Sequence, residues 1–357
     1  MTVETVGAFT AHGTGDFNQF SPAITQVGSD RFAVAWSDQQ NPYLIQGEVF
    51  TGGGASTGSF TVRGTGDFYQ ASPTITQVGP DRFAVAWVDG QFPYVVQGEV
   101  FTNGGASTGS FTVRGTGDNS QEEPTMTPVG TDRFAVAWQD GDGGFRGDPD
   151  VIQGEVFTSA GAPTGSFTIT RDNEQADPTI TQVGSDRFAV AWANPQSTSE
   201  IQGEVFTNGG ASTGSFTVRG TGSGGHASPT ITQVGSDRFA VAWADGLNPS
   251  VIQGDVFKHD GALTGTFTVH GNANNGQRMP TMTQVGTERF AVAWRDMQGP
   301  AVIQGEVFTS GGASTGSFTV RGPGDNYQSA PTITQLGTDR FAVAWADGLD
   351  SSAVQGE

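Results

Sequence analysis

The feature that most constrains this chain is a seven-residue phrase that returns at a fixed interval. "DRFAVAW" occupies residues 30–36 and returns six more times with at most one change. All seven tryptophans end copies of it, and by subtraction they are 51, 51, 54, 51, 51 and 51 residues apart: Trp36, Trp87, Trp138, Trp192, Trp243, Trp294 and Trp345. A period near fifty residues indicates copies of one supersecondary unit.

Each copy contains four runs rich in Val, Ile, Thr and Phe, separated by Gly, Asp, Asn and Ser. In the second copy they are PTITQV (73–78), RFAVAW (82–87), VVQGEVF (95–101) and GSFTVR (109–114). This pattern predicts four strands joined by tight turns. Because no window has capped helical periodicity, we expect almost no helix.

The second strand of each repeat has one bulky face and one small face. Side chains alternate along a strand, so Phe32, Val34 and Trp36 share one face while Ala33 and Ala35 share the other. Such sheets can stack face to face, with the bulky side chains of one sheet filling the space left by the alanines of the next sheet. We therefore predict an all-β fold, a seven-bladed β-propeller of four-stranded blades, as a single domain over residues 1–357.

The two ends of the chain supply complementary parts of one repeat. The sequence stops at "AVQGE" (353–357), within a third strand, and begins with "VGAFTAHGTGD" (6–16), which aligns with the fourth-strand text "TGSFTVRGTGD". We expect residues 1–13 to complete the seventh blade, which would close the ring and leave no unpaired edge at the junction.

The pattern "Q..PTITQVG.DRFAVAW.D......IQGEVF...G...GSFTV" resembles the repeats of large bacterial surface and secreted proteins, including calcium-dependent adhesins. The likeness covers all seven copies and is carried by the Trp, Gln-Gly and Gly-Phe positions. Seven-bladed bacterial lectins share the general layout. The resemblance implies a propeller blade and a role at a cell surface.

The charge composition of the chain argues against two classes of binding partner. A formal net charge of −20 argues against nucleic acid and anionic membranes, which require clusters of Lys and Arg. With no cysteine, stability must come from packing and ring closure. No apolar stretch is long enough to span a membrane. The composition and the resemblance favour a secreted or cell-surface location, and because "MTVETVGAF" is not a signal peptide, a cytoplasmic location stays open. We expect a monomer.

Function is sought where the repeats differ. In this strand order, two sets of loops share one side of the ring: those between the second and third strands of each repeat, and those that connect one repeat to the next. These segments vary, as in 37–44, 88–95, 139–151 and 193–200, or 13–22, 115–124, 220–229 and 271–280. We call their side the variable face, and the side with the nearly invariant remaining turns the constant face. Loops on a rigid scaffold often bind ligands, although exposed loops also drift freely.

Two polar positions recur on the variable face. An acidic or amide residue stands two places after the tryptophan: Asp38, Asp89, Asp140, Asn194, Asp245, Asp296 and Asp347. A second polar residue precedes each first strand: Gln19, Gln70, Gln121, Gln175, His226, Gln277 and Gln328. The structural interpretation is that Asp caps a turn and Gln bridges blades. The alternative is one polar pocket per blade that binds a sugar.

Sugars bind where hydroxyls meet carboxylates and amides while the apolar ring face lies on an aromatic side chain. The candidate aromatics crowd repeats near the chain's ends, so we expect unequal pockets: Phe17, Phe20, Tyr43, Phe68, Tyr69, Phe92, Tyr94 and Tyr327. The repeated tryptophans are interpreted as blade packing.

The third variable loop is three residues longer and places Asp140, Asp142, Asp148 and Asp150 within eleven residues. Oxygen ligands with glycine suit calcium, but the spacing departs from the EF-hand loop. Calcium is therefore a possible cofactor, and no other is expected. The integrin-type tripeptide at residues 146–148 is treated as chance.

Enzyme chemistry finds little support, because none of the four histidines lies beside a nucleophile pattern or has metal spacing. The enzyme alternative is a hydrolase or lyase with a site over the central channel. We predict a multivalent carbohydrate-binding or adhesive module that recognises glycans or a cell-surface partner. The alternative is a structural or protein-interaction propeller with one unique patch.

Overall fold

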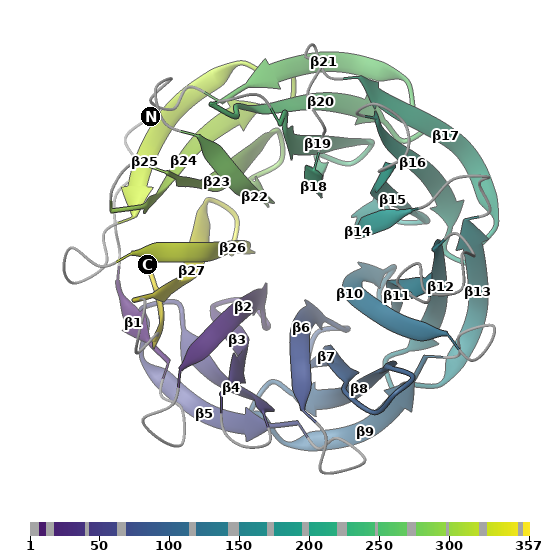
Figure 1. Ribbon diagram of the computed structural model, residues 1–357, viewed down its shortest axis with the longest axis vertical. Coiled ribbons are helices and arrows are strands. Elements are labelled where there is room, and N and C mark those ends of the chain that lie inside the picture. The colour runs from purple at the N-terminus through teal and green to yellow at the C-terminus, as the bar shows by residue number, and fades with distance from the viewer. Residues whose placement is uncertain are drawn as a thin grey trace.

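The computed structural model describes residues 7–11, 18–39, 43–62, 69–113, 119–141, 150–169, 175–194, 200–219, 227–246, 249–269, 276–297, 300–320, 327–348 and 353–357. Within these ranges the secondary structure is β-strand and turn, without helix. The strands form seven separate four-stranded antiparallel sheets arranged as a ring (Figure 1). The predicted seven-bladed β-propeller is confirmed.

The first three blades take their strands in chain order from the inside outward. Blade 1 contains β2 (Gln19–Gln26), β3 (Arg31–Asp38), β4 (Leu44–Thr51) and β5 (Ser56–Thr61). Blade 2 contains β6 (Gln70–Gln77), β7 (Arg82–Asp89), β8 (Val95–Thr102) and β9 (Ser107–Thr112). Blade 3 contains β10 (Ser120–Val129), β11 (Arg133–Gly141), β12 (Val151–Thr158) and β13 (Pro163–Ile169).

The next three blades repeat this order. Blade 4 contains β14 (Ala176–Val183), β15 (Arg187–Asn194), β16 (Glu200–Thr207) and β17 (Ser212–Arg219). Blade 5 contains β18 (Ala227–Val234), β19 (Arg238–Ala244), β20 (Ile252–Lys258) and β21 (Leu263–Thr268). Blade 6 contains β22 (Gln277–Val285), β23 (Arg289–Asp296), β24 (Val302–Thr309) and β25 (Ser314–Val320).

Blade 7 is assembled from both ends of the chain. Its inner strands are β26 (Gln328–Leu336), β27 (Arg340–Asp347) and β28 (Ala353–Gly356), and its outer strand is β1 (Phe9–Thr10). Phe9 pairs with Gly356 and Thr10 with Gln355, and the Ala11 N–H donates to the Val354 carbonyl at 2.8 Å. The N-terminal strand therefore closes the ring as predicted.

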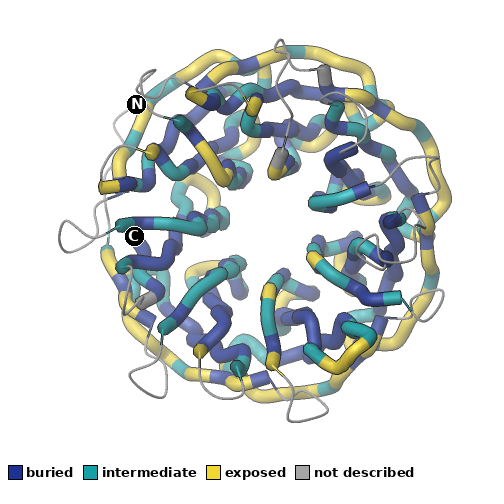
Figure 2. The backbone as a smooth tube through the Cα atoms, in the orientation of Figure 1, coloured by how far each residue is buried: buried dark blue, intermediate teal, exposed yellow. Residues whose placement is uncertain are grey.

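Blades pack with the bulky face of one sheet against the small face of the preceding sheet. Ala33 and Ala35 of blade 1 share a buried cluster with Phe83, Val85 and Trp87 of blade 2. The same arrangement joins blades 7 and 1, where Ala342 and Ala344 meet the Phe32 face. In Figure 2 the middle strands are buried while the outermost strands carry most of the exposed backbone. The alternation read from residues 32–36 thus sets the interface between blades.

Each innermost strand has a bulge immediately before its proline. The pre-proline residue adopts a positive φ near 50° in all seven blades: Ser21, Ser72, Glu123, Asp177, Ser228, Met279 and Ala330. The pairing register shifts at the same place, for example between Ala71 and Thr74. Because a non-glycine residue pays for this conformation, the bulge is a built feature that turns the start of the strand.

The described part of the chain includes no helix with the length and apolar character needed to cross a membrane.

Candidate functional site

The residues two places after each tryptophan are buried. They are at most 5% exposed: Asp38, Asp89, Asp140, Asn194, Asp245, Asp296 and Asp347. Asp89 Oδ1 accepts from the Gln91 N–H at 3.3 Å, and Asp245 Oδ1 accepts from the Val251 N–H at 2.9 Å. These bonds hold the turn after the second strand, as the structural interpretation predicted. Burial raises the pKa of Asp347.

The recurring glutamines join neighbouring blades, and five of them do so through two hydrogen bonds each. The Gln70 N–H donates to the Tyr43 carbonyl at 3.0 Å, and Gln70 Oε1 accepts from the Ile45 N–H at 3.1 Å. Gln121, Gln175, Gln277 and Gln328 repeat both bonds, and Gln19 Oε1 accepts from the Val354 N–H across the ring closure. All six are buried. His226, at the remaining position, lies outside the described residues.

This burial changes how the predicted sugar pockets must be interpreted. The Asp and Gln side chains lie beneath the surface and organise the loops, so an external ligand would meet other groups first. The tryptophans are also buried, at most 1% exposed, and pack between blades as expected. A direct role of the Asp and Gln residues in ligand binding stays a prediction.

Five aromatic side chains gather into one strip on the variable face of blades 1 and 2. Their ring centroids are 5.8 Å apart for Phe20–Tyr43, 6.5 Å for Tyr43–Tyr69, 6.0 Å for Tyr69–Tyr94 and 6.2 Å for Phe92–Tyr94. Every neighbouring pair meets edge to face, the arrangement that aromatic quadrupoles favour. We call Phe20, Tyr43, Tyr69, Tyr94 and Phe92 the aromatic strip.

The strip is partly open to solvent. Phe92 is 82% exposed and Tyr69 is 39% exposed, so both belong to the exposed large apolar side chains of the described residues. Amides edge the strip, because Asn18 Nδ2 donates to Gln39 Oε1 at 2.9 Å and Gln39 Nε2 lies 3.0 Å from the Tyr43 hydroxyl. Burial, and then the hydrogen bond with Tyr94, raise the pKa of Tyr69 to about 12. Its hydroxyl therefore keeps its proton at physiological pH.

One cross-strand pair differs from blade to blade although its backbone position is constant. It consists of the residue before the bulge and, on the neighbouring strand, the residue directly after the tryptophan. From blade 1 to blade 7 the pairs are Phe20–Ser37, Ala71–Val88, Glu122–Gln139, Ala176–Ala193, Ala227–Ala244, Arg278–Arg295 and Ser329–Ala346. We call these the variable pairs. They make a regular ring chemically asymmetric, with an aromatic, an acidic and a basic sector.

The acidic sector lies at blades 3 and 4. Gln139 Nε2 donates to Asp150 Oδ2 at 2.7 Å, and burial, followed by the nearby Asp150 charge, raises the pKa of Glu122. Glu123 Oε2 accepts from the Asp177 N–H at 2.9 Å. Partial burial, and then the Asp177 charge, raise the pKa of Glu123 to about 7.

The predicted calcium loop is only partly described. Asp140 and Asp150 are buried, and Asp140 Oδ2 accepts from the Trp138 indole N–H at 3.4 Å. Asp142 and Asp148 lie outside the described ranges. The side chains that are described form no group of three metal-binding residues. Calcium binding stays a prediction.

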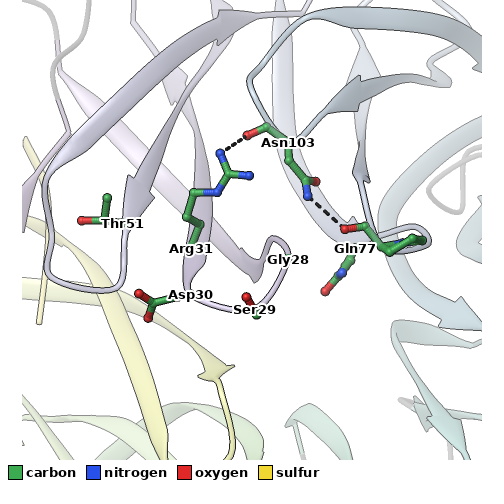
Figure 3. Close-up of a pocket in the computed structure, with 8 residues that line it drawn as sticks. Gly28, Ser29, Asp30, Arg31, Thr51, Gln77 and Asn103 are labelled. Atoms are coloured by element: carbon green, nitrogen blue, oxygen red, sulfur yellow. Dashed lines mark hydrogen bonds between the residues drawn. The ribbon is translucent and has the colours of Figure 1, made fainter.

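A pocket that the sequence did not reveal opens on the constant face between blades 1 and 2. Its volume of about 650 Å³ falls within the range of ligand sites. Figure 3 shows the Arg31 guanidinium directed at Asn103. Arg31 Nη1 donates to the Asn103 carbonyl at 3.3 Å, and Asn103 Nδ2 donates to the Pro80 carbonyl at 3.0 Å. The remaining lining is Gly28, Ser29, Asp30, Thr51 and Gln77. Since these turns are nearly identical in every repeat, no sequence signal distinguished this pocket.

The structure brings together five of the eight predicted aromatics. Phe17 and Phe68 lie outside the described residues. Tyr327 belongs to blade 7 and contacts the guanidinium of Arg295 rather than the strip. The variable pairs could not be predicted from the sequence, because the bulge shifts the pairing register and simple alternation does not identify the partners.

Comparison with known proteins shows the fold alone. No protein-family model and no curated protein sequence matches this chain. A protein of unknown function from Dyadobacter fermentans is 11% identical, with a TM-score of 0.57, and the match covers 99% of this chain and 97% of that one. A prolyl endopeptidase has the same identity and TM-score, and its match covers 95% of this chain but 46% of the endopeptidase.

The propeller domain of the trilobed protease from Pyrococcus furiosus is 9% identical with a TM-score of 0.50, and the match covers 94% of this chain and 93% of that domain. It is described as having an open velcro topology. Here, by contrast, β1 pairs with β28. The chain is a seven-bladed β-propeller whose ring is closed by its own N-terminal strand.

Proposed function

We propose that this propeller is a carbohydrate-binding module whose aromatic strip receives the sugar. The observation that carries the proposal is the confinement of five contacting rings to the variable face of blades 1 and 2. Exposed aromatic side chains bind the apolar faces of sugars, and a rigid scaffold keeps the cost of ordering them low.

The polar surroundings of the strip suit hydroxyl groups better than charges. Asn18 and Gln39 supply amides, and the tyrosines supply hydroxyl groups. Amides and hydroxyls both donate and accept, so they match a ligand whose groups do the same. Beneath them, the backbone N–H groups of Gln70 and Gln121 donate to the backbone carbonyls of Tyr43 and Tyr94 and so fix the loop ends that carry these tyrosines.

The arrangement favours one extended site over seven equivalent sites. The equivalents of Tyr43 and Tyr94 are Asp150, Ser250 and Ala301 in blades 3, 5 and 6, which offer no aromatic platform. An adhesive role would then depend on the number of chains displayed rather than on several sites in one ring.

A glycan array followed by calorimetry on the best ligand tests the proposal. Tyr69→Ala and Phe92→Ala should each weaken binding about tenfold, equivalent to about 1.4 kcal/mol of lost contact, while the melting temperature changes little. The matched control is Leu263→Ala, because Leu263 is 56% exposed at the constant-face end of β21 and should leave binding unchanged.

Two results would count against a carbohydrate-binding strip. One is an array on which no glycan binds, which would favour the protein-interaction alternative. The other is a bound glycan whose affinity is the same for Tyr69→Ala, Phe92→Ala and the Leu263→Ala control.

A further inference from the structure

Two arginines of blade 6 lie directly opposite one another on adjacent strands. Arg278 of β22 pairs with Arg295 of β23 in the variable-pair position. Like charges at directly opposed positions destabilise a sheet. The other blades place small, aromatic, aliphatic or acid-amide pairs there, so blade 6 carries an arrangement that the fold does not require.

No carboxylate of the described chain compensates this pair. The ion pairs found there join Arg82, Arg133, Arg238 and Arg340 to aspartates of the constant face. Arg295 Nε is buried and has no hydrogen-bond partner in the part of the chain that is described. Burial, and then the neighbouring Arg278, lower the pKa of Arg295. Two positive groups therefore face each other in a protein of net charge −20.

The next blade holds the Arg295 guanidinium in place. Its central carbon lies 4.2 Å from the centroid of the Tyr327 ring, a cation–π contact that engages the face of the guanidinium rather than its N–H groups. Tyr327 is itself fixed, because its carbonyl accepts from the Gly348 N–H at 3.0 Å. The following residue, Gln328, bridges to the Ile303 N–H at 2.9 Å. The site thus lies between blades 6 and 7.

The site is open on its solvent side. Arg278 is exposed, and Met279 and Met297 nearby are 40% and 39% exposed. Two arginines on paired strands and an aromatic ring against one of them therefore lie together on the variable face, and the exposed Met279 and Met297 are within two residues of the arginines in the chain. Such a set offers charge for an anion and apolar surface for the group that carries it.

We propose that Arg278 and Arg295 bind the carboxylate of an acidic sugar. This inference rests on the proposed carbohydrate-binding function and adds a second subsite to it. A planar carboxylate matches the fork of a guanidinium, and an anion between the two arginines removes their mutual repulsion. The sugar ring would lie against Tyr327 and the methionines.

The test compares glucuronate with glucose, which differ at the carboxylate, by NMR titration of the full chain. Wild-type protein should bind glucuronate at least tenfold more tightly than glucose, the scale of one charge-assisted hydrogen bond. Arg278→Gln and Arg295→Met should each remove that preference and leave glucose binding unchanged. The matched control is Arg82→Gln, on the constant face. Because the net charge repels anions at long range, ionic strength is not used as the readout.

The variants should fold, since each removes a like-charge contact, and an unchanged or higher melting temperature checks this. Equal affinity for glucuronate and glucose, or Arg variants that keep the preference, would overturn the proposal. Inorganic sulfate that displaces glucuronate and binds as tightly would overturn the sugar part, because it would show a site for free anions. If Tyr69→Ala and Phe92→Ala leave neutral glycan binding intact, the proposed function fails while the arginine result stands separately.

Discussion

At the scale of single residues, one repeat differs at both positions of a polar contact that four of its siblings make. The third-strand glutamates Glu48, Glu99, Glu204 and Glu306 each accept a hydrogen bond from a serine hydroxyl at the start of the fourth strand. Blade 5 has Asp255 and Leu263 at these two positions. Asp255 is 8% exposed, and burial raises its pKa to about 6. Leu263 meanwhile exposes apolar surface.

Restoring both residues should stabilise the protein and change its pH dependence. The folded pKa of Asp255 lies above its ordinary value of 3.8, so the native state binds more protons than the unfolded state between about pH 4 and 6. Its contribution to stability is therefore full below about pH 4 and is lost as pH rises through 6. At pH 8, Asp255→Glu with Leu263→Ser should gain about 1.5–3 kcal/mol, the net contribution of a hydrogen bond to a charged group.

Chemical denaturation at pH 4, 6 and 8 provides the measurement, with Leu263→Ser alone as the control. The double variant should lose part of the decline between pH 4 and 6 that the wild type shows. Identical declines in the two proteins would mean that Asp255 does not govern this pH range.

At the scale of the strand, glycine and phenylalanine form a fixed pair within each blade. Gly98 of β8 pairs with Phe111 of β9, and the aromatic ring covers the glycine. A Cβ atom on Gly98 would lie 2.0 Å from Phe111 Cζ. The Phe111 ring cannot move aside without loss of packing, because its centroid lies 5.1 Å from that of Phe134 and 4.8 Å from that of Phe157, both in the next blade. The Gln-Gly and Gly-Phe positions noted in the sequence are thus one packing unit.

Gly98→Ala should cost about 1–3 kcal/mol, the usual range for overpacking a core. Gly104→Ala is the control, because its Cβ would meet nothing closer than Thr102 Oγ1 at 3.7 Å and should shift stability by less than about 0.5 kcal/mol. Urea denaturation measures both. Equal stabilities for the two variants would show that the ring of Phe111 yields without cost.

At the scale of the whole molecule, the sequence predicted the scaffold well and the site poorly. The period of the tryptophans, the alternation in residues 32–36 and the split last repeat were sufficient for blade number, face packing and closure. The site depended on details that periodicity does not contain. Burial removed Asp38 and its equivalents from the surface, and the bulge before each proline brought Arg278 opposite Arg295. The assembly of Tyr43, Tyr69 and Tyr94 into one strip required the curvature of the ring.

Ring closure should depend strongly on a short segment. Deleting residues 1–11 removes β1, exposes the edge of β28 and takes away Phe9, whose ring lies 4.8 Å from Phe32 and 4.7 Å from Phe50. Phe9→Ala alone should cost about 3–5 kcal/mol, as for other buried aromatics. The deletion should cost at least as much and lower the melting temperature clearly. A calorimetric melt with an unchanged midpoint would show that the ring does not need this strand.

The shared last blade also sets an order of events during synthesis. Six blades can be complete before residues 327–357 leave the ribosome, yet the first of them still presents Phe32, Val34 and Trp36 without their final neighbours. At the other end, Ala291 and Ala293 of the sixth blade stay uncovered until Val343 and Trp345 of the seventh blade pack against them. The nascent chain is therefore an open arc with an apolar surface at each end, and two such arcs are complementary to one another. Until residues 327–357 have been synthesised, the contact that will close one molecule can equally join two.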